Sequence, residues 1–267
     1  MLHVTDASAA EPAPPPSLLA PDEPAPFELL EDRANSPFLI TCDHASNRLP
    51  RALGTLGLPE SELERHIAWD LGAAGVARQL AQRLGACAVF QNYSRLVIDC
   101  NRRPGVPSSI AVLSENTLIP GNQALPPVEA ERRARAIFEP YHACIAGELA
   151  RRARVGQPTV LIAMHSFTPS FNGVARPWHV GVLYNRDTRL ARALLDLLRR
   201  DSMLVVGDNE PYAVSDLSDY GVVEYGERLG NLHVEIEIRQ DLLSWASGQA
   251  EWAERMAELL TRAHAMI

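Results

Sequence analysis

The sequence predicts a three-layer α/β/α fold built on a mostly parallel mixed sheet. Apolar runs of strand length alternate with amphipathic segments of helix length along most of the chain, and several of the strand-like runs are apolar throughout. This alternation is typical of a sheet covered by helices on both faces. The length of 267 residues allows one large or two small domains, and we expect a single α/β domain over residues 27–267.

The expected elements follow one another without an internal repeat. We expect strands near 37–42, 86–91, 95–99, 158–164, 178–184, 203–207 and 232–238. We expect helices near 60–84, 128–154, 188–200, 217–229 and 248–264. The first of these helices follows Pro59, carries Glu60, Glu62 and Glu64 in its first turns and stops before Gly85, which are typical helix-end signals.

Two segments are expected to lie outside this pattern. Residues 1–26 are dominated by Pro, Ala and Glu, and such a composition buries too little apolar surface to offset the entropy of ordering. We therefore predict a flexible tail there. The stretch 101–127 is rich in Pro, Gly, Ser and Asn, and loops of this length more often cover an active site than merely connect two elements.

Charge and composition exclude several classes of function. The net charge of −8 and the pI of about 5.5 argue against a nucleic-acid or anionic-membrane partner, because either would require a basic face. All 25 basic residues are Arg, so chemistry that depends on a lysine, such as a Schiff base or a P-loop, is excluded. Arginine is well suited to hold a carboxylate, so we expect a small anionic ligand.

The cysteines and the start of the chain indicate a cytoplasmic protein. Cys42, Cys87, Cys100 and Cys144 have no CxxC spacing, and we expect reduced core residues. The first residues lack the pattern of a signal peptide, and no apolar stretch approaches the roughly 18 residues of a membrane span.

Two histidines stand where buried strands are expected to end. His44 follows the run Phe38–Cys42 and its neighbour Asp43, and His165 follows the run 159–163. Ligands collect at the carboxyl ends of strands in open α/β sheets, so two imidazoles at one edge indicate a divalent metal site with an open position. Asp43 could fix the tautomer of His44 or of another ligand. The alternative for each histidine is an ordinary hydrogen-bonding role.

The third metal ligand is expected to be acidic. Asp70 lies in an otherwise apolar stretch of the first predicted helix, where a carboxylate is costly to bury unless a cation or a donor meets it. His66 lies one helical turn earlier on the same face and is a competing ligand. Its alternative role is that of a solvent-facing partner for Glu62.

The last predicted strand alternates between charged and aliphatic residues. Glu235, Glu237 and Arg239 share one face, whereas the intervening residues point to the other. We expect Glu237 to be the general base that activates water, with its pKa raised by partial burial, and Glu235 is the alternative for this role. An edge strand with a solvated charged face is the competing interpretation.

Arginines near these segments are candidates for binding a substrate carboxylate in the bidentate manner that a guanidinium allows. The candidate substrate-binding residues are Arg95, Asn101, Arg102, Ser166, Arg176 and Arg239. An ion pair between one of the arginines and Asp99 is the structural alternative. A serine nucleophile is disfavoured because Ser46 and Ser166 lack a Gly-x-Ser-x-Gly context, and adjacent strand residues point to opposite faces.

Five ordered motifs, taken together, resemble the N-formylglutamate amidohydrolase family, in its less characterised branch. They are Cys-Asp-His-Ala-Ser-Asn at 42–47, Trp-Asp-Leu-Gly-Ala at 69–73, Ser-Arg-Leu-Val-Ile-Asp-Cys-Asn-Arg at 94–102, His-Ser-Phe-Thr-Pro at 165–169 and Glu-Ile-Arg-Gln-Asp at 237–241. The resemblance implies a fold like those of zinc carboxypeptidases and cell-wall amidases. It also implies zinc-dependent hydrolysis of an N-acyl amide on an acidic amino acid such as N-formylglutamate.

By this resemblance His44, Asp70 and His165 are the metal ligands and Glu237 is the catalytic carboxylate, which agrees with the assignment from the residues alone. Two rival hypotheses remain. One is a non-catalytic module that binds an amino acid or small anion through its arginines without a metal. The other is a cell-wall-type amidase, which the absence of a visible export signal disfavours.

Overall fold

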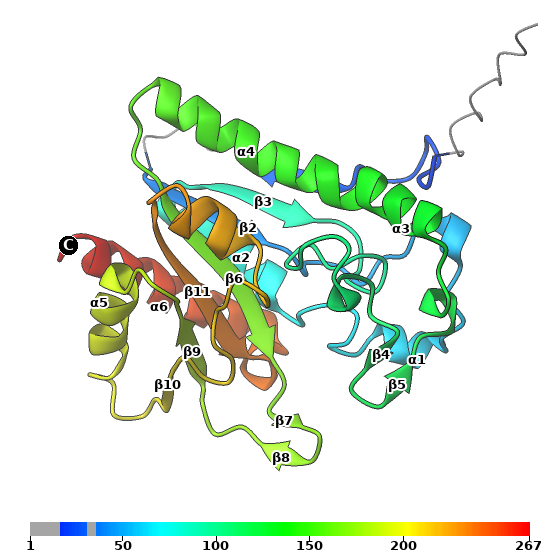
Figure 1. Ribbon diagram of the computed structural model, residues 1–267. Helices are drawn as coiled ribbons and strands as arrows, with labels where there is room; N and C mark the ends of the chain where they lie inside the picture. The colour runs from blue at the N-terminus through cyan, green and yellow to red at the C-terminus, as the bar shows by residue number, and fades with distance from the viewer. Residues whose placement is uncertain (1–16, 31–35) are drawn as a thin grey trace, which may run out of the picture.

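The computed structural model describes residues 17–30 and 36–267, and it is organised around a seven-stranded sheet (Figure 1). The strands of this sheet are β1 (Phe27–Leu30), β2 (Phe38–Cys42), β3 (Cys87–Gln91), β6 (Val160–Phe167), β9 (Val180–Leu183), β10 (Val206–Asp208) and β11 (Leu232–Arg239). Their order is β1-β3-β2-β6-β11-β9-β10, and only the β1/β3 and β11/β9 pairs of this sheet are antiparallel. The predicted mostly parallel mixed sheet is therefore confirmed.

Helices cover both faces of this sheet, which confirms the three-layer class (Figure 1). The α-helices are α1 (Glu60–Leu63), α2 (Ala73–Leu84), α3 (Pro127–Arg133), α4 (Glu139–Arg154), α5 (Arg189–Leu198) and α6 (Ala246–His264). Helices α2, α5 and α6 pack with the larger apolar cluster, and α4 packs with the second cluster on the opposite face. Two small hairpins, β4 (Leu113–Ser114) with β5 (Thr117–Leu118) and β7 (Ser170–Phe171) with β8 (Val174–Ala175), stand apart from the sheet.

Strand β11 lies inside the sheet, between β6 and β9. Its aliphatic residues Val234, Ile236 and Ile238 are fully buried in the larger apolar cluster. Glu235 and Glu237 consequently point to the other face, and both are buried as well. The interpretation of this segment as a solvated edge strand is therefore wrong.

The predicted helix 60–84 is interrupted between α1 and α2. Residues 64–72 form turns instead, and the backbone N–H of Asp70 donates to the carbonyl of His44 at 2.9 Å. Gly72 has a left-handed backbone with φ of 78°, and a Cβ atom there would lie 2.4 Å from the Cβ of Leu243. Asp70 therefore lies on the segment that enters α2 and not inside a helix.

The predicted strand 95–99 is also absent from the structure. The backbone N–H of Leu96 donates to the Ser94 hydroxyl at 3.1 Å, and that of Val97 donates to the Ser94 carbonyl at 3.0 Å. These local bonds replace those of a strand ladder and turn the chain. The predicted helix 217–229 is reduced to a π-helical segment, Val222–Glu227, whereas β1 and the two hairpins were not predicted.

The predicted helix 128–154 consists of α3 and α4 joined by a π-helical turn, Ala134–Phe138. Pro140 lies in the first turn of α4 and has no backbone N–H to donate. The N–H of Glu139 reaches back to the carbonyl of Ala134, five residues earlier. The wider turn keeps the two helices in one continuous rod across the sheet.

Part of the predicted flexible tail packs against the protein. Leu18 is buried in the second apolar cluster, and the Tyr93 hydroxyl donates to the carbonyl of Pro24 at 2.8 Å. Packing therefore begins before residue 26, because the apolar side chain of Leu18 is buried. The proline-rich composition around Leu18 gave no indication of this contact. Residues 1–16 lie outside the described residues, so the prediction for them is not tested.

Two further expectations concern membranes and cysteines. Within the described ranges, no helix has both the length and the apolar character needed to cross a membrane. Cys42, Cys87 and Cys100 are buried, and none of the four cysteines takes part in a disulfide.

Candidate metal centre

Parallel strands bring the two predicted histidines to one edge of the sheet. His44 lies two residues after the end of β2, and His165 lies near the end of β6. Because β2 and β6 are neighbours and run parallel, their carboxyl ends meet. Asp70 reaches the same place because the backbone bond between Asp70 and His44 pins the segment before α2 against the end of β2.

The three side chains converge as the sequence predicted. One ligand atom of each of His44, Asp70 and His165 lies within 4.8 Å of the other two, and all three residues are buried. Oδ2 of Asp70 is 3.3 Å from Nδ1 of His44 and 2.9 Å from Nδ1 of His165. Imidazole and carboxylate groups in this number are the donors found in zinc sites that keep an open position.

The protonation of His44 favours a cation at this point. Its Nε2 lies 2.8 Å from Oδ1 of Asp99. Burial, followed by the charge of Arg95, lowers the pKa of His44 to about 4. Burial opposes ionisation of Asp99, but its contacts with His44 outweigh this effect and lower the Asp99 pKa. A neutral imidazole that donates Nε2–H to Asp99 presents a lone pair on Nδ1 toward Asp70, and this arrangement fits a cation between them.

His165 faces a different carboxylate. Its Nε2 lies 3.9 Å from Oδ2 of Asp43, so Asp43 is directed toward His165 and not toward its sequence neighbour His44. Neither of these two buried atoms has a hydrogen-bond partner in the described part of the chain. Burial alone would lower the pKa of His165, but the charges of Glu235, Glu237 and Asp43 outweigh it and raise this pKa.

Asp70 is itself oriented by its neighbours. Its Oδ1 forms an ion pair with Arg95, and the backbone N–H of Ser166 donates to Oδ2 at 3.3 Å. The Ser166 hydroxyl donates to the carbonyl of Leu71 at 2.8 Å, which ties β6 to the segment before α2. Because the guanidinium of Arg95 holds Oδ1, Oδ2 remains directed at the two histidines.

Strand β11 contributes two glutamates to the same region as the two histidines. Glu237 is opposite His165 in the parallel register of β11 and β6, and Glu235 is opposite Ala163. Oε2 of each glutamate is buried without a hydrogen-bond partner among the described residues. Burial raises the pKa of Glu237, with the charges of His165 and Arg95 opposing it. Burial and then the charge of Asp219 raise the pKa of Glu235 well above its usual value.

These groups line a cavity of about 300 Å³, which is at the small end of the range for ligand sites. The lining residues that the sequence analysis singled out are His44, His66, Asp70, Arg95, Asn101, Arg102, His165, Ser166, Glu235 and Glu237. The lining residues that it did not assign to the site are Phe167, Tyr212, Ala213, Ser218 and Asp219.

Tyr212 reaches the cavity because two glycines allow a turn to approach the sheet. A Cβ atom at Gly181 or Gly207 would lie 2.1 or 2.5 Å from the carbonyl oxygen of Glu210. The turn that carries Tyr212 could not lie so close to side chains larger than hydrogen. Small residues at facing strand positions were the available signal in the sequence.

The six candidate substrate-binding residues occupy different environments. The side chain of Asn101 accepts from the backbone N–H of Tyr220 at 2.9 Å and donates to Asp219 at 3.3 Å, so it anchors the 219–221 segment. Arg239 does not line the cavity; its Nη1 donates to the carbonyls of residues 176–178 and its Nε pairs with Asp241.

Arg176 also lies outside the lining set but contacts it. The guanidinium carbon of Arg176 is 4.8 Å from the centre of the Tyr212 ring and 4.6 Å from that of Phe171. These cation–π contacts place a positive charge beside the wall of the cavity that Tyr212 forms.

His66 is not part of the converging triad. Its Nε2 lies 3.5 Å from Oε1 of Glu115, on the turn between β4 and β5, whereas Glu62 forms an ion pair with Arg65. Burial lowers the pKa of His66 to about 4. The contact brings part of the long 101–127 segment beside His66, which lines the cavity, and the covering role of this segment stays a prediction.

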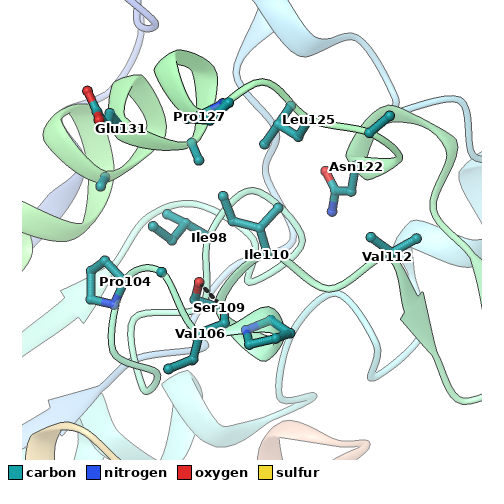
Figure 2. A pocket seen from close by; sticks show the side chains of 15 residues that line it. Ile98, Pro104, Val106, Ser109, Ile110, Val112, Asn122, Leu125, Pro127 and Glu131 are labelled. Atoms are coloured by element: carbon teal, nitrogen blue, oxygen red, sulfur yellow. Dashed lines mark hydrogen bonds between the residues drawn. The ribbon is translucent and has the colours of Figure 1, made fainter.

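A larger cavity, of about 630 Å³, lies between the 101–127 segment and α3 (Figure 2). Most of its lining is proline and aliphatic side chains. The hydroxyl of Ser109 already donates to the Val106 carbonyl, and the amide of Asn122 donates to the carbonyls of Leu96 and Ala111. Glu131 is the one charged side chain among the described residues that line this cavity, so the cavity lacks the converging donors of a catalytic site, despite its size.

Sequence comparison relates this chain to a known protein family. The model of the N-formylglutamate amidohydrolase family matches residues 36–244. A curated relative, N-formylglutamate deformylase from Pseudomonas aeruginosa, is 32% identical over 130 residues, which cover 45% of this chain and 47% of the relative. The match thus spans about half the length of that relative.

Two solved structures are similar over most of the chain. The gene product Atu2144 from Agrobacterium tumefaciens is 37% identical with a TM-score of 0.90, and the match covers 93% of this chain and 98% of that one. The N-formylglutamate amidohydrolase from Ralstonia eutropha JMP134 is 19% identical with a TM-score of 0.64, covering 89% of this chain and 99% of that one. At this identity the second match supports the fold alone.

Proposed function

This chain belongs to the N-formylglutamate amidohydrolase family, and from that membership we propose that it is a metal-dependent amidohydrolase that cleaves the N-acyl amide of an acidic amino acid such as N-formylglutamate. One observation carries the proposal. Two imidazoles and a carboxylate, all buried, converge within 4.8 Å in a cavity that is also lined by Glu235 and Glu237, each with one buried oxygen that has no hydrogen-bond partner among the described residues.

We assign His44, Asp70 and His165 as the residues that hold the divalent cation, with zinc as the expected metal. Nδ1 of each histidine faces Oδ2 of Asp70, and the outer nitrogen of each faces a separate carboxylate. Metal-binding histidines typically direct their second nitrogen at a carboxylate in this way. When bound, such a cation polarises the amide carbonyl and makes water more acidic.

Glu237 is the proposed general base. It takes a proton from the attacking water while the water oxygen bonds to the amide carbon, and it returns that proton to the nitrogen as the C–N bond breaks. The products are a carboxylic acid and a free amino group. Burial raises the pKa of Glu237, which makes its carboxylate a better proton acceptor. Glu235 is less suited, because it lies opposite Ala163 and not opposite His165, and because burial and the charge of Asp219 raise its pKa well above the usual value.

Arg95 and Arg102 are the proposed contacts for the substrate carboxylates. Both line the cavity, and Nε of Arg95 is buried without a hydrogen-bond partner in the described structure. The guanidinium of Arg102 is held in place, because its Nη1 donates to the carbonyls of Asn101 and Ser218. Guanidinium groups oriented in this way suit the two carboxylates of an acidic N-acyl amino acid.

The test is release of free amine from a small panel of substrates. N-formyl-, N-acetyl- and N-carbamoyl-glutamate would be compared with N-formyl-leucine, each before and after chelation and after return of zinc. We expect N-formylglutamate to be hydrolysed, chelation to abolish the reaction and zinc to restore it. Hydrolysis that survives removal of the metal would contradict the mechanism. Binding of the acidic compounds without any turnover would favour the non-catalytic module.

A further inference from the structure

A tyrosine on α4 contacts a carboxylate next to the proposed metal centre. Tyr141 lies in α4 and is completely buried in the second apolar cluster. Its hydroxyl donates to Oδ1 of Asp43, the residue that follows β2. A phenol with its oxygen buried in an apolar cluster usually requires such a partner, and here the partner is a carboxylate at the edge of the metal centre.

The second oxygen of Asp43 is directed at His165. Oδ2 of Asp43 and Nε2 of His165 are 3.9 Å apart, and each is buried without a hydrogen-bond partner among the residues described. Leaving both atoms unpaired costs free energy, whereas a bond between them would satisfy both. Nδ1 of the same ring faces Asp70 at 2.9 Å.

The two histidines have their outer carboxylates held by different means. Asp99, which faces His44, accepts the backbone N–H of Asn101 at 2.8 Å on the same oxygen that His44 contacts. Asp43, which faces His165, is fixed through a side chain from a distant helix. The carboxylate that faces His165 is thus bonded by a phenol that lies 98 residues away from Asp43 in the sequence.

We propose that Tyr141 is a positioning residue for the metal centre: by holding Oδ1 of Asp43, it aligns Oδ2 to accept Nε2–H of His165, so that Nδ1 of His165 presents its lone pair to the cation. The proposal rests on the metal-binding role assigned to His165 above. It adds a second requirement, because the affinity for the metal then depends on a residue that contacts neither metal nor substrate.

The chemistry of the phenol suits this role. Burial and then the charge of Asp43 raise the pKa of Tyr141 well above its usual value, so the hydroxyl stays protonated and remains a donor. A donor on Oδ1 also keeps Asp43 from rotating away. Removing partners of this outer kind lowers metal affinity by roughly 10- to 100-fold in other metal sites, and we expect a loss of about 10-fold here.

The experiment measures zinc affinity by competition with a chelator, using the full chain. Tyr141→Phe removes only the hydroxyl, and Tyr93→Phe is the matched control because its phenol is equally buried but donates to the Pro24 carbonyl. We expect zinc to bind about 10-fold more weakly to Tyr141→Phe and unchanged to Tyr93→Phe. Equal losses in both variants, or no loss in Tyr141→Phe, would overturn the proposal.

A double-mutant cycle with Asp43→Asn separates positioning from general loosening. If Tyr141 acts through Asp43, Tyr141→Phe has little further effect on zinc affinity in the Asp43→Asn background. Fully additive losses would overturn the proposal even if both single variants bind weakly. The wild-type arm tests the proposed function separately: failure of the wild type to bind zinc refutes the metal centre itself, whereas normal wild-type binding with an unaffected Tyr141→Phe refutes only the role of Tyr141.

Discussion

Buried ionisable groups lie near both ends of strand β2, and they differ in whether the protein supplies their hydrogen-bond partners. At its start, Arg152 of α4 is buried and donates through Nε to Glu148 and through both terminal nitrogens to the carbonyls of residues 36–38. At its end, Asp43 and the nearby His165 each keep one buried atom without a partner in the described chain. Both regions are equally hidden from solvent, but only one is satisfied by the protein itself.

This difference separates structural from functional polar groups. A buried charge costs free energy unless it is paired, so selection for stability alone would leave few unpaired groups. Arg152 is paired with Glu148 and with backbone carbonyls, so we assign it a structural role. Oε2 of Glu235 and Oε2 of Glu237 have no partner within the described residues, and both glutamates line the same cavity as His44, Asp70 and His165, where a ligand can satisfy them. Four changes test this division, in order of decreasing effect.

The largest effect is expected at Glu237. Glu237→Gln removes the proposed base while keeping the size of the side chain, so kcat should fall by about 100- to 10,000-fold, with metal content unchanged. Amine release and elemental analysis measure the two quantities. Glu235→Gln is the matched control and should lose far less, since Glu235 lies opposite Ala163 and not opposite His165. The reverse order of losses would exchange the roles of the two glutamates.

At the other end of β2, Arg152→Met should destabilise the protein by about 3 kcal/mol without changing zinc affinity. The change leaves buried carbonyls without donors. Urea unfolding of the metal-free protein measures the loss, with the more exposed neighbour Arg151 as control: Arg151→Met should change the free energy of unfolding by less than about 0.5 kcal/mol. A loss of zinc affinity in Arg152→Met would show that the two ends are not independent.

His142 provides a test by pH. Both ring nitrogens are bonded, to the Tyr225 hydroxyl and the Cys100 carbonyl, each at 2.9 Å, and burial lowers its pKa to about 4. The unfolded chain takes up this proton near pH 6.5. The contribution of His142 to stability is therefore fully present above pH 6.5 and is lost as the pH falls to about 4, by up to about 1.4 kcal/mol per pH unit. His142→Phe should flatten the acid side of the stability curve of the metal-free protein, and an unchanged slope would refute this assignment.

The smallest effect should have the opposite sign. Glu235→Met replaces a buried carboxyl that has an unpartnered oxygen with an apolar side chain of similar length, and it should stabilise the metal-free protein by about 1 kcal/mol. The same replacement is destabilising at Arg152, so the two methionine variants form a direct pair. Thermal unfolding after chelation measures both. A destabilised Glu235→Met would mean that this carboxyl serves the fold.

Sequence patterns predicted the sheet and much of the site because both depend on short periodicities. Alternation along β11 separated Glu235 and Glu237 from the aliphatic core, and the apolar runs before His44 and His165 located two strand ends. The same reasoning placed Asp70 in a helix, because an apolar stretch with a helical period does not reveal that its backbone bonds to His44 instead.

Contacts between distant segments were beyond these patterns. The pairing of His44 with Asp99 depends on a turn that Ser94 initiates, where the sequence predicted a strand. Likewise, the link from Tyr141 to Asp43 depends on how α4 crosses the sheet, which no local signal specifies. The carboxylates that face the outer nitrogens of His44 and His165 could therefore be identified only from the three-dimensional structure.

Metal content is the most direct test of the central claim that His44, Asp70 and His165 form one cation site. Elemental analysis of the tag-free protein, purified without added metal or chelator, should give close to one divalent transition-metal ion per chain, and none in His44→Ala or His165→Ala. An active wild-type protein without stoichiometric metal, or alanine variants that retain the ion, would contradict the account.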